Sequence, residues 1–493
     1  MDFNPIRTRL CLVRLAVLVL LTLPSFAHAQ QQGLLPLELR PYRVVLFVAA
    51  DVPQHSIAPH ENWLESIQQT ATRCVGAQWN LTVRSVDWLQ PISAEGLTRL
   101  TAESLVQRSS AKRDDFDVWL VAAVRSSGSG FRVDVRGWQP AIGVDAGLAG
   151  SDVYDWRDVP VTLVKSGYAS FRPVGLVEDV DGTQVRVLIQ GSALAVSDPA
   201  FAASRESQVF TPLLAGRNRE QVIERLQQIP WTYLTAGATQ GHRLQCDLQS
   251  GLRSPIGGKQ RGRVETLAVT VIPVSAVTEL ELTTQSRPSL PLAGHRIELR
   301  DSADIPPADA SGGKDDHLIQ RILTDRRGRV SIPASRGQVI WLFAYSGSHL
   351  LARVPILPGV QPELRLEVPD DSSRLETEAE LHMFQGQLVE AVAARNTAAA
   401  RIRAAIKKND KSLARAAEAE LRKQPDAQVF LTQLLAIRVP AVKGAKTRRD
   451  RAGEARINRM CDEMAVLIQQ YLGEDKRKVV LEELKAMEEV EGE

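Results

Sequence analysis

Two histidines and two carboxylates occur within eleven residues near the start of the chain, at a spacing that could hold a metal ion. Asp51, His55, His60 and Glu61 follow an apolar run that ends at Ala50. Zinc accepts imidazole and carboxylate ligands, and the loop after a strand often holds ligands in α/β domains. A polar loop with Glu61 in the first turn of a helix explains the same residues without a metal. We therefore expect no catalytic residue, cofactor or metal, and keep His55, His60 and Asp51 as the candidates.

Three shorter motifs resemble parts of catalytic or ligand-binding sites but lack the partners that the chemistry needs. Ser109-x-x-Lys112 matches the nucleophile motif of penicillin-binding enzymes, but no Ser-x-Asn element follows at the required place. Gly257-Gly258-Lys259 is followed by Gln260, so the hydroxyl that holds magnesium in a phosphate loop is missing. The segment 179–182 begins like a calcium loop without the later acceptors. We interpret all three as chance matches.

Charge and aromatic residues give little support for nucleic-acid binding. The basic run of residues 443–451 has no interleaved aromatic side chains, which are the mark of base stacking. We interpret this run as a solvated linker, with contact to an acidic partner or an anionic polymer as the alternative. The eight tryptophans could include a platform for sugars, but Trp119 and Trp341 lie in apolar runs and are expected in the core.

The first 29 residues have the pattern of a bacterial secretory signal peptide. Arg7, Arg9 and Arg14 precede the uncharged apolar run 15–23, and Ala27-His28-Ala29 is a small-x-small cleavage site. The run is much shorter than the roughly twenty residues that span a bilayer, so we expect cleavage near Ala29 and a periplasmic or secreted protein without a membrane span. These residues carry three arginines and one aspartate, so their removal lowers the formal charge from +2 to zero.

The elements that position these residues change in character along the chain. Residues 30–41 are expected to form a leader, and 42–157 an α/β domain with the order β-α-β-α-β-β. In it, strands are predicted at 42–50, 81–88, 118–124 and 131–135, and helices at 63–74 and 94–107. Residues 158–263 are predicted to be β-rich and barrel-like, with a strand at 161–164, one helix at 219–228 and a tight turn at Asp181-Gly182.

Evenly spaced short strands over residues 264–369 predict an antiparallel β-sandwich. Within it, residues 291–299 (PLAGHRIEL), 324–330 (TDRRGRV) and 339–344 (VIWLFA) resemble the carboxypeptidase-regulatory-like, or transthyretin-like, family. The resemblance implies a sandwich in which the Thr-Asp-x-x-Gly turn feeds a central strand. It implies no activity, because most members of this family are non-catalytic modules of exported proteins.

Residues 370–493 are predicted to be a helical bundle. Apolar residues from Leu381 to Leu413 recur at a spacing near 3.6, which indicates a long amphipathic helix broken at Asn409-Asp410. Shorter helices are predicted at 429–438, ended by Pro440, then around 457–472 and at 479–487. The fold class is therefore multidomain α+β: an α/β unit, a β-rich middle, an antiparallel sandwich and a C-terminal helical bundle.

Three cysteines remain after the signal peptide, and they are far apart in the sequence. Cys74 and Cys461 lie on apolar helical stripes and are expected to be buried free thiols. A Cys74–Cys246 disulfide is the alternative, because an exported protein meets oxidising conditions.

Together these patterns predict an exported, non-catalytic scaffold or binding protein of the cell envelope. We expect an envelope or extracellular protein or polysaccharide as its partner, with the helical region as the element that contacts protein. Two alternatives remain: a secreted hydrolase with its site in the N-terminal α/β domain, and a protein that binds cell-wall glycans.

Overall fold

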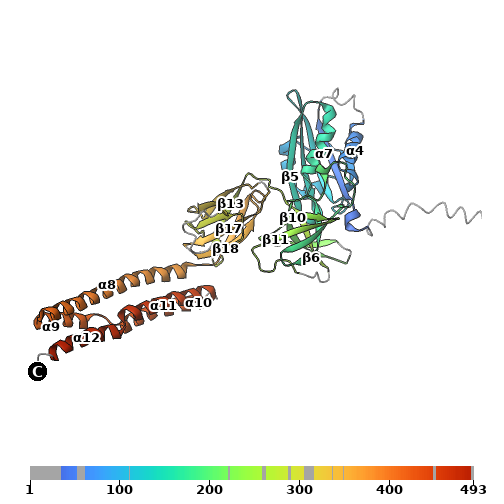
Figure 1. Cartoon of the computed structure of the whole chain (residues 1–493). Coiled ribbons are helices and arrows are strands. Elements are labelled where there is room, and N and C mark those ends of the chain that lie inside the picture. Colours follow the sequence, from blue (N-terminus) through green and yellow to red (C-terminus); the bar gives the residue numbers. More distant parts are fainter. Residues whose placement is uncertain are drawn as a thin grey trace, which may run out of the picture. The chain divides into compact units, whose positions relative to one another are not determined.

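The computed structural model describes residues 35–52, 62–109, 111–219, 222–257, 263–286, 290–304, 316–335, 337–347, 349–447 and 451–489. The fold is mixed, with several sheets and a C-terminal helical region (Figure 1). It divides into two compact units. One comprises Met1–Leu282 with Pro291–Leu366, and the other comprises Thr283–Leu290 with Glu367–Glu493. The predicted fold class is confirmed.

The first sheet is a five-stranded α/β layer with the strand order β2-β1-β3-β4-β5. Strand β1 lies parallel to β2 and β3, and β4 and β5 extend the sheet antiparallel. The strands are β1 (Tyr42–Asp51), β2 (Trp79–Ser85), β3 (Val118–Ser127), β4 (Gly130–Gln139) and β5 (Val144–Val153). The helices are α4 (Trp63–Cys74), α5 (Ala94–Thr98), α6 (Ala102–Ser109) and α7 (Val159–Ala169). The second helix that we predicted is therefore two short ones.

Both faces of this sheet are covered. Alternate residues of β1, such as Leu46, pack with Ile67 of α4 and Leu163 of α7 on one side. Their neighbours, such as Phe47, pack with Leu97 of α5 on the other. A strand buried on both sides is continuously apolar, which explains why β1 was recognisable in the sequence.

The second sheet closes into a barrel. Its strand order is β10-β11-β7-β6-β12-β8-β9, and an additional pairing of β10 with β8 closes a ring of six strands, leaving β9 at the side. Apolar residues of alternate positions fill the interior, among them Val187, Phe210, Leu234 and Ala268. The strands are β6 (Val174–Asp181), β7 (Gln184–Ile189), β8 (Val209–Arg217), β9 (Ile223–Gln228), β10 (Thr232–Gln240), β11 (Arg243–Ser250) and β12 (Val264–Thr270).

Two predicted elements of this region are wrong. The strand predicted at 161–164 lies inside α7, where Pro160 occupies the first turn and Leu163 is fully buried. A short apolar run reads equally well as a buried helix or a buried strand. The helix predicted at 219–228 is instead the strand β9, which pairs antiparallel with β8. Pairing with a neighbouring strand overrides the local helical preference of its polar residues.

The third region is a sandwich of a three-stranded sheet, β16-β13-β19, and a four-stranded sheet, β15-β14-β17-β18. Buried residues include Leu280, Ile297, Ile332, Leu342 and Leu366. The strands are β13 (Val277–Thr284), β14 (Arg296–Arg300), β15 (Leu318–Leu323), β16 (Arg329–Pro333), β17 (Ile340–Ser346), β18 (His349–Ile356) and β19 (Glu363–Val368). The strand β12, which lies at the predicted boundary between the middle region and the sandwich, pairs with β6 and β8 of the barrel.

The Thr-Asp-x-x-Gly segment of the sandwich forms a tight turn before β16. The Asp325 carboxylate accepts hydrogen bonds from the backbone N–H groups of Arg327 and Arg329, both at 2.8 Å. Those bonds favour the charged form and lower the pKa of Asp325. Gly328 has φ +69°, which a side chain would strain. The strand that follows this turn lies at one edge of its sheet, not at its centre.

The C-terminal unit contains five described helices. They are α8 (Ser372–Lys408), α9 (Lys411–Lys423), α10 (Ala427–Thr447), α11 (Arg451–Leu472) and α12 (Glu474–Glu489). The predicted break at Asn409-Asp410 is confirmed: Asn409 has φ +53°, and the Asp410 side chain accepts from the Leu413 N–H at 3.0 Å. The predicted end at Pro440 is wrong, because α10 continues through it to Thr447.

Two apolar clusters hold the helices together. One joins α8, α10 and α11 through residues such as Phe384, Phe430 and Ile468. The other joins α8, α9 and α12 through residues such as Ile402, Leu421 and Leu484. Part of the basic run belongs to these helices: Lys443 and Lys446 lie in α10, and Arg451 begins α11, while Arg448 and Arg449 lie outside the described residues.

Candidate functional site

The residues first considered for metal chemistry fall mostly outside the described part of the chain. His55, His60 and Glu61 lie in the undescribed stretch 53–61. Asp51 is the exposed last residue of β1, opposite Arg125 of β3. Within the described residues, no group of three His, Cys, Asp or Glu side chains is placed to hold a metal ion.

The other sequence motifs form local turns where they are described. Ser109 is the last residue of α6, and its hydroxyl accepts from the Ala111 N–H at 3.4 Å. The Lys112 N–H donates to the Asp115 carboxylate at 2.9 Å, so the two motif residues belong to a polar turn. Asp179 pairs with Arg186 across the hairpin whose tip is Gly182.

The three cysteines described are free thiols. Cys246 is buried in the barrel core, and burial raises its pKa to about 12. Cys461 is buried in the helical unit, and burial raises its pKa as well. Cys74 differs from expectation because it is half-buried at the end of α4, where it lines a recess of 470 Å³ between α4 and α7.

A larger cavity of 790 Å³ lies where the α/β layer meets the barrel. It is lined by the start of β1, the segment before β3, the end of β4, and parts of β6, β8, β9 and β12. We call it the junction cavity. Polar lining residues are Arg40, Arg43, Asn80, Arg113, Asp114, Asp117, Gln139, Gln190 and Arg217, and apolar ones include Leu37, Phe116, Ile142, Val174, Ile223 and Leu267.

Hydrogen bonds between the two layers fix the walls of the junction cavity. The buried Tyr42 hydroxyl accepts from the Val174 N–H at 2.9 Å and donates to the Val174 carbonyl at 3.2 Å. Burial raises the pKa of Tyr42, so the hydroxyl keeps its proton and both bonds. Gln139 donates to the carbonyl of Arg172 at 2.8 Å. The start of β1 is thereby joined to the start of β6.

The arginines of the junction cavity differ in their partners. Arg43 pairs with Asp117, with Nη2 and Oδ1 at 2.7 Å. Arg217 pairs with Glu265 through Nε and Oε1 at 2.6 Å. Arg40 donates to the carbonyl of Leu35 at 3.1 Å.

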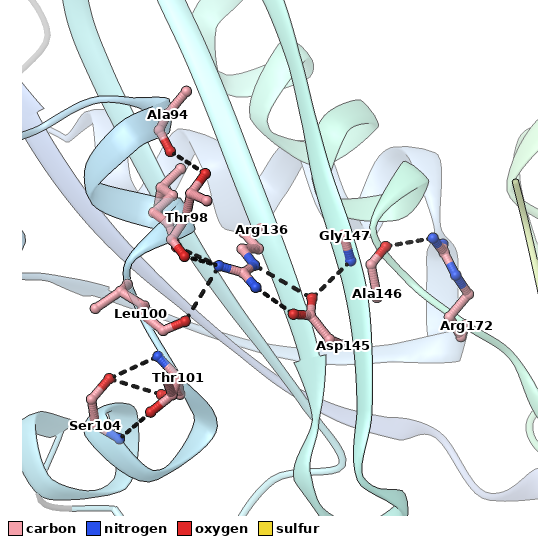
Figure 2. Close-up of polar contacts among 11 residues, drawn as sticks. Ala94, Thr98, Leu100, Thr101, Ser104, Arg136, Asp145, Ala146, Gly147 and Arg172 are labelled. Carbon is pink, nitrogen blue, oxygen red and sulfur yellow. Dashed lines mark hydrogen bonds and ion pairs between the residues drawn. The ribbon is translucent and has the colours of Figure 1, made fainter. Parts of the chain in front are cut away.

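A neighbouring recess of 430 Å³ shares Arg113 and Pro140 with the junction cavity. On its wall Arg136 holds the end of α5 to β4 and β5 (Figure 2). Its Nη1 donates to the carbonyls of Leu97 and Thr98, both at 2.8 Å, and the guanidinium pairs with Asp145. With its donors used in this way, Arg136 has a structural role.

A second group of charges lies on the outer face of the four-stranded sheet of the sandwich. Glu298 is 3% exposed and Arg300 is 2% exposed, with Nη1 and Oε2 at 3.2 Å. Arg321 donates to the other oxygen of Glu298 at 2.9 Å. Arginine guanidinium groups lie over the rings of this face, with Arg296 4.4 Å from the Tyr345 centroid. The charged groups of this face therefore contact one another and the aromatic rings beside them.

Two of the tryptophans, Trp63 and Trp156, line the recess between α4 and α7. Each of the eight is buried or half-buried, and Trp119 and Trp341 are 0% and 8% exposed. The expectation that these two lie in the core is confirmed.

Exposed apolar side chains occur on the helical unit. Leu435 and Val439 are one turn apart on α10, with 54% and 61% of their surface exposed, beside Pro440. Others are Leu375, Met383, Val389, Leu413, Val429, Val466, Tyr471 and Val479. In the described part of the chain, the helices fall short of the length and apolarity that crossing a membrane requires.

Comparison with known proteins assigns no family. The sequence matches no family model, and no curated protein is significantly similar to it. Among solved structures, TolB from Acinetobacter baumannii is 12% identical, over 64% of this chain and 83% of that chain, with a TM-score of 0.17. The pilus 2b backbone protein of group B streptococcus is 8% identical, over 51% of this chain and 97% of that chain, with a TM-score of 0.14. At these TM-scores neither likeness places this chain in a family.

Proposed function

We propose that this chain is an exported, non-catalytic scaffold or binding protein of the cell envelope, and that its helical unit contacts a partner protein. The α/β layer, barrel and sandwich form the body that carries this unit. We also propose that the sandwich is of the carboxypeptidase-regulatory-like kind, on the strength of the three sequence segments that resemble it.

The observation that carries this proposal is the exposed pair Leu435 and Val439 on α10. Both side chains lie on the side of α10 away from Phe430 and Leu434, which are buried in the core of the unit. Burying two side chains of this size in an interface is favourable by about 25 cal/mol for each Å² of apolar surface removed from water. Large exposed apolar side chains that lie together mark contact sites.

Export is supported by the N-terminal sequence pattern, and it has its own test. Mass spectrometry of the protein recovered from its native cells should find a mature N-terminus at Gln30. Recovery of the intact N-terminus from the cytoplasmic fraction would contradict export while leaving the helical contact open.

The contact is tested by photo-crosslinking in intact cells. A photoreactive amino acid at Ala436, which is exposed between Leu435 and Val439, should give one discrete adduct. The double variant Leu435→Glu, Val439→Glu should reduce the adduct at least about tenfold, because two charges in a desolvated contact cost more than the 1.4 kcal/mol that corresponds to this factor.

The matched control places the same two charges elsewhere on the exposed side of α10, in the double variant Gln428→Glu, Thr432→Glu. It should keep the adduct, and circular dichroism should show equal helix content in all variants. The proposal fails if no adduct forms, or if both double variants reduce it equally.

A further inference from the structure

We propose that the junction cavity binds a small amphipathic anion, a molecule with an apolar body and a single carboxylate or phosphate group. This inference does not depend on the proposed function, because it concerns the α/β layer and barrel and not the helical unit. It rests on the size of the cavity, the apolar lining and the distribution of charge among the arginines.

The size and lining are those of a small-molecule site. A volume of 790 Å³ lies within the range of about 300–1,000 Å³ that is typical of ligand pockets, which occur preferentially between domains. Leu267 and Ile142 are 6% and 9% exposed, and Phe116, Val174 and Ile223 are half-buried. An apolar ligand body of several carbons would remove this surface from water.

The charge around this apolar lining is positive. Four arginines line the cavity against two aspartates. Asp117 balances Arg43, and Glu265 balances Arg217, so these two pairs hold the walls.

Arg40 and Arg113 are the remaining lining cations, beside one remaining lining carboxylate, Asp114. Among the described residues, no carboxylate forms an ion pair with Arg40. The nearest carboxylate to Arg113 is that of Glu103 at 3.7 Å, and both side chains are more than half exposed. Guanidinium groups bind carboxylate and phosphate in a bidentate manner, so these two are the groups that recognise an anion.

The wall is formed before any ligand arrives. The bonds from Tyr42 to Val174 and from Gln139 to Arg172 join the two layers beside the cavity. A preformed site spends less binding free energy on ordering itself. The cavity lies at the starting ends of β1 and β3, the opposite end of the sheet from Asp51. It is therefore a separate location from the loop first considered for metal binding.

The test uses isothermal titration calorimetry on the mature chain from Gln30, with decanoate and decyl phosphate as anionic probes. Decanol and decyltrimethylammonium have the same apolar chain with no charge or the opposite charge. We expect saturable binding of at least one anion with a stoichiometry of one, and binding of the other two probes at least about tenfold weaker. Which anion binds more tightly distinguishes carboxylate from phosphate ligands. Equal binding of all four probes, or none, overturns the proposal.

Substitutions locate the binding. Arg40→Gln and Arg113→Gln should each weaken binding of the anion about tenfold, the size expected for a lost charge-assisted hydrogen bond. Arg99→Gln is the matched control, because Arg99 is an exposed arginine that pairs with Glu95 on α5, outside the cavity. The proposal is overturned if Arg99→Gln weakens binding as much as the other two, or if neither Arg40→Gln nor Arg113→Gln changes the affinity.

The alternative to a ligand is that residues 30–34 of the chain itself occupy the junction cavity. A chain that begins at Leu35 should bind the anion as tightly as the chain that begins at Gln30. If only the shorter chain binds, residues 30–34 fill the cavity and the ligand proposal is wrong.

Discussion

The sheets and the helices of this protein bury their surfaces in different ways. In the α/β layer, β1 has apolar residues on both faces, so Leu46 and Phe47 belong to separate cores. In the helical unit each helix buries one stripe, and α10 shows Phe430 to the core and Val439 to solvent. The sheets also bury charge beside charge, as in Glu298 with Arg300. The helical unit also contains such a pair, Arg374 with Asp371, and places the buried Arg395 against backbone carbonyls.

This difference separates positions where a substitution changes stability from positions whose surface is available to a partner. A strand covered on both faces has no side left for a partner, so substitutions there act on folding. A helix with one buried stripe has a second side that can change without unfolding the unit. Binding variants should therefore be sought on the helices and in the junction cavity, and stability variants in the sheets.

The largest expected effect is from Phe47→Ala in β1. Phe47 is 1% exposed and lies 6.1 Å from the Trp119 ring, centroid to centroid, so its removal leaves a cavity. We expect a loss of about 3–5 kcal/mol in the free energy of unfolding of the first compact unit. Calorimetry of the full chain should show this transition shifted while the transition of the helical unit stays in place.

Ile468→Ala is the matched substitution in the helical unit, where Ile468 is fully buried. It should shift only the other transition, by about 2–5 kcal/mol. If either substitution moves both transitions together, the two units unfold as one and the comparison between them does not hold.

The same difference explains which elements could be predicted from the sequence. The strand β1 could be predicted because burial on both faces gives a strand a continuous apolar run. The helix α4 could be predicted because burial on one face gives a helix apolar residues at a spacing near 3.6. The strand β9 could not be predicted because its two apolar residues, Ile223 and Leu226, are three positions apart, as on a helix, and its pairing with β8 is set by tertiary structure. The helix α10 passes Pro440 because its core contacts continue to Ala445.

The junction cavity could not be predicted from the sequence. It gathers residues from Leu35 to Leu267, and no local motif links Arg40 with Arg113 or Ile223. Only the pairing of the strands and the bond between Tyr42 and Val174 bring them to one place. The candidate residues His55 and His60 lie five residues apart in the sequence, and residues 53–61 lie outside the described part of the chain.

Buried charge in the sandwich gives the next largest effect. Glu298→Gln removes the carboxylate that Arg300 and Arg321 contact at 3.2 and 2.9 Å, and leaves the buried Arg300 charge without this partner. We expect a loss of about 3 kcal/mol in the free energy of unfolding by urea. Glu281→Gln is the control, since its pair with Arg365 is partly exposed and 3.9 Å apart, and should cost about 0–1 kcal/mol. Equal losses would show that burial does not decide the effect.

A smaller effect is expected for Arg395→Met in α8. Arg395 donates to the carbonyls of Leu472 and Gly473 at 2.7 and 3.1 Å, at the end of α11. Burial lowers the pKa of its guanidinium, which nevertheless stays charged at neutral pH. Losing these donors should cost about 1–2 kcal/mol in the helical transition. Arg401→Met, which removes an exposed pair with Glu420 at 2.8 Å, should leave the transition almost unchanged. A larger effect for Arg401→Met would contradict the assignment of Arg395 as the arginine that closes α11.

The smallest expected effect concerns Asp410, the residue that caps the start of α9. Asp410 accepts from the Leu413 N–H and the Ser412 hydroxyl, and these bonds lower its pKa. A carboxyl group whose folded pKa is lower than its unfolded pKa stabilises the fold above the unfolded value, near 4, and loses this contribution as the pH falls through the folded value. The helical transition should therefore move to lower urea concentration on acidification.

Asp410→Asn separates the charge from the cap. Asparagine caps a helix about as well as aspartate but does not titrate, so the advantage of the wild type at neutral pH should shrink as the pH falls below about 4. Asp410→Ala removes the acceptor and should be less stable than Asp410→Asn at every pH. An advantage of the wild type over Asp410→Asn that stays constant with pH would mean that the Asp410 charge does not stabilise the start of α9. A dependence on pH would show that the charge of Asp410 at the start of α9 contributes to the stability of the helical unit, in addition to the apolar stripe of each helix.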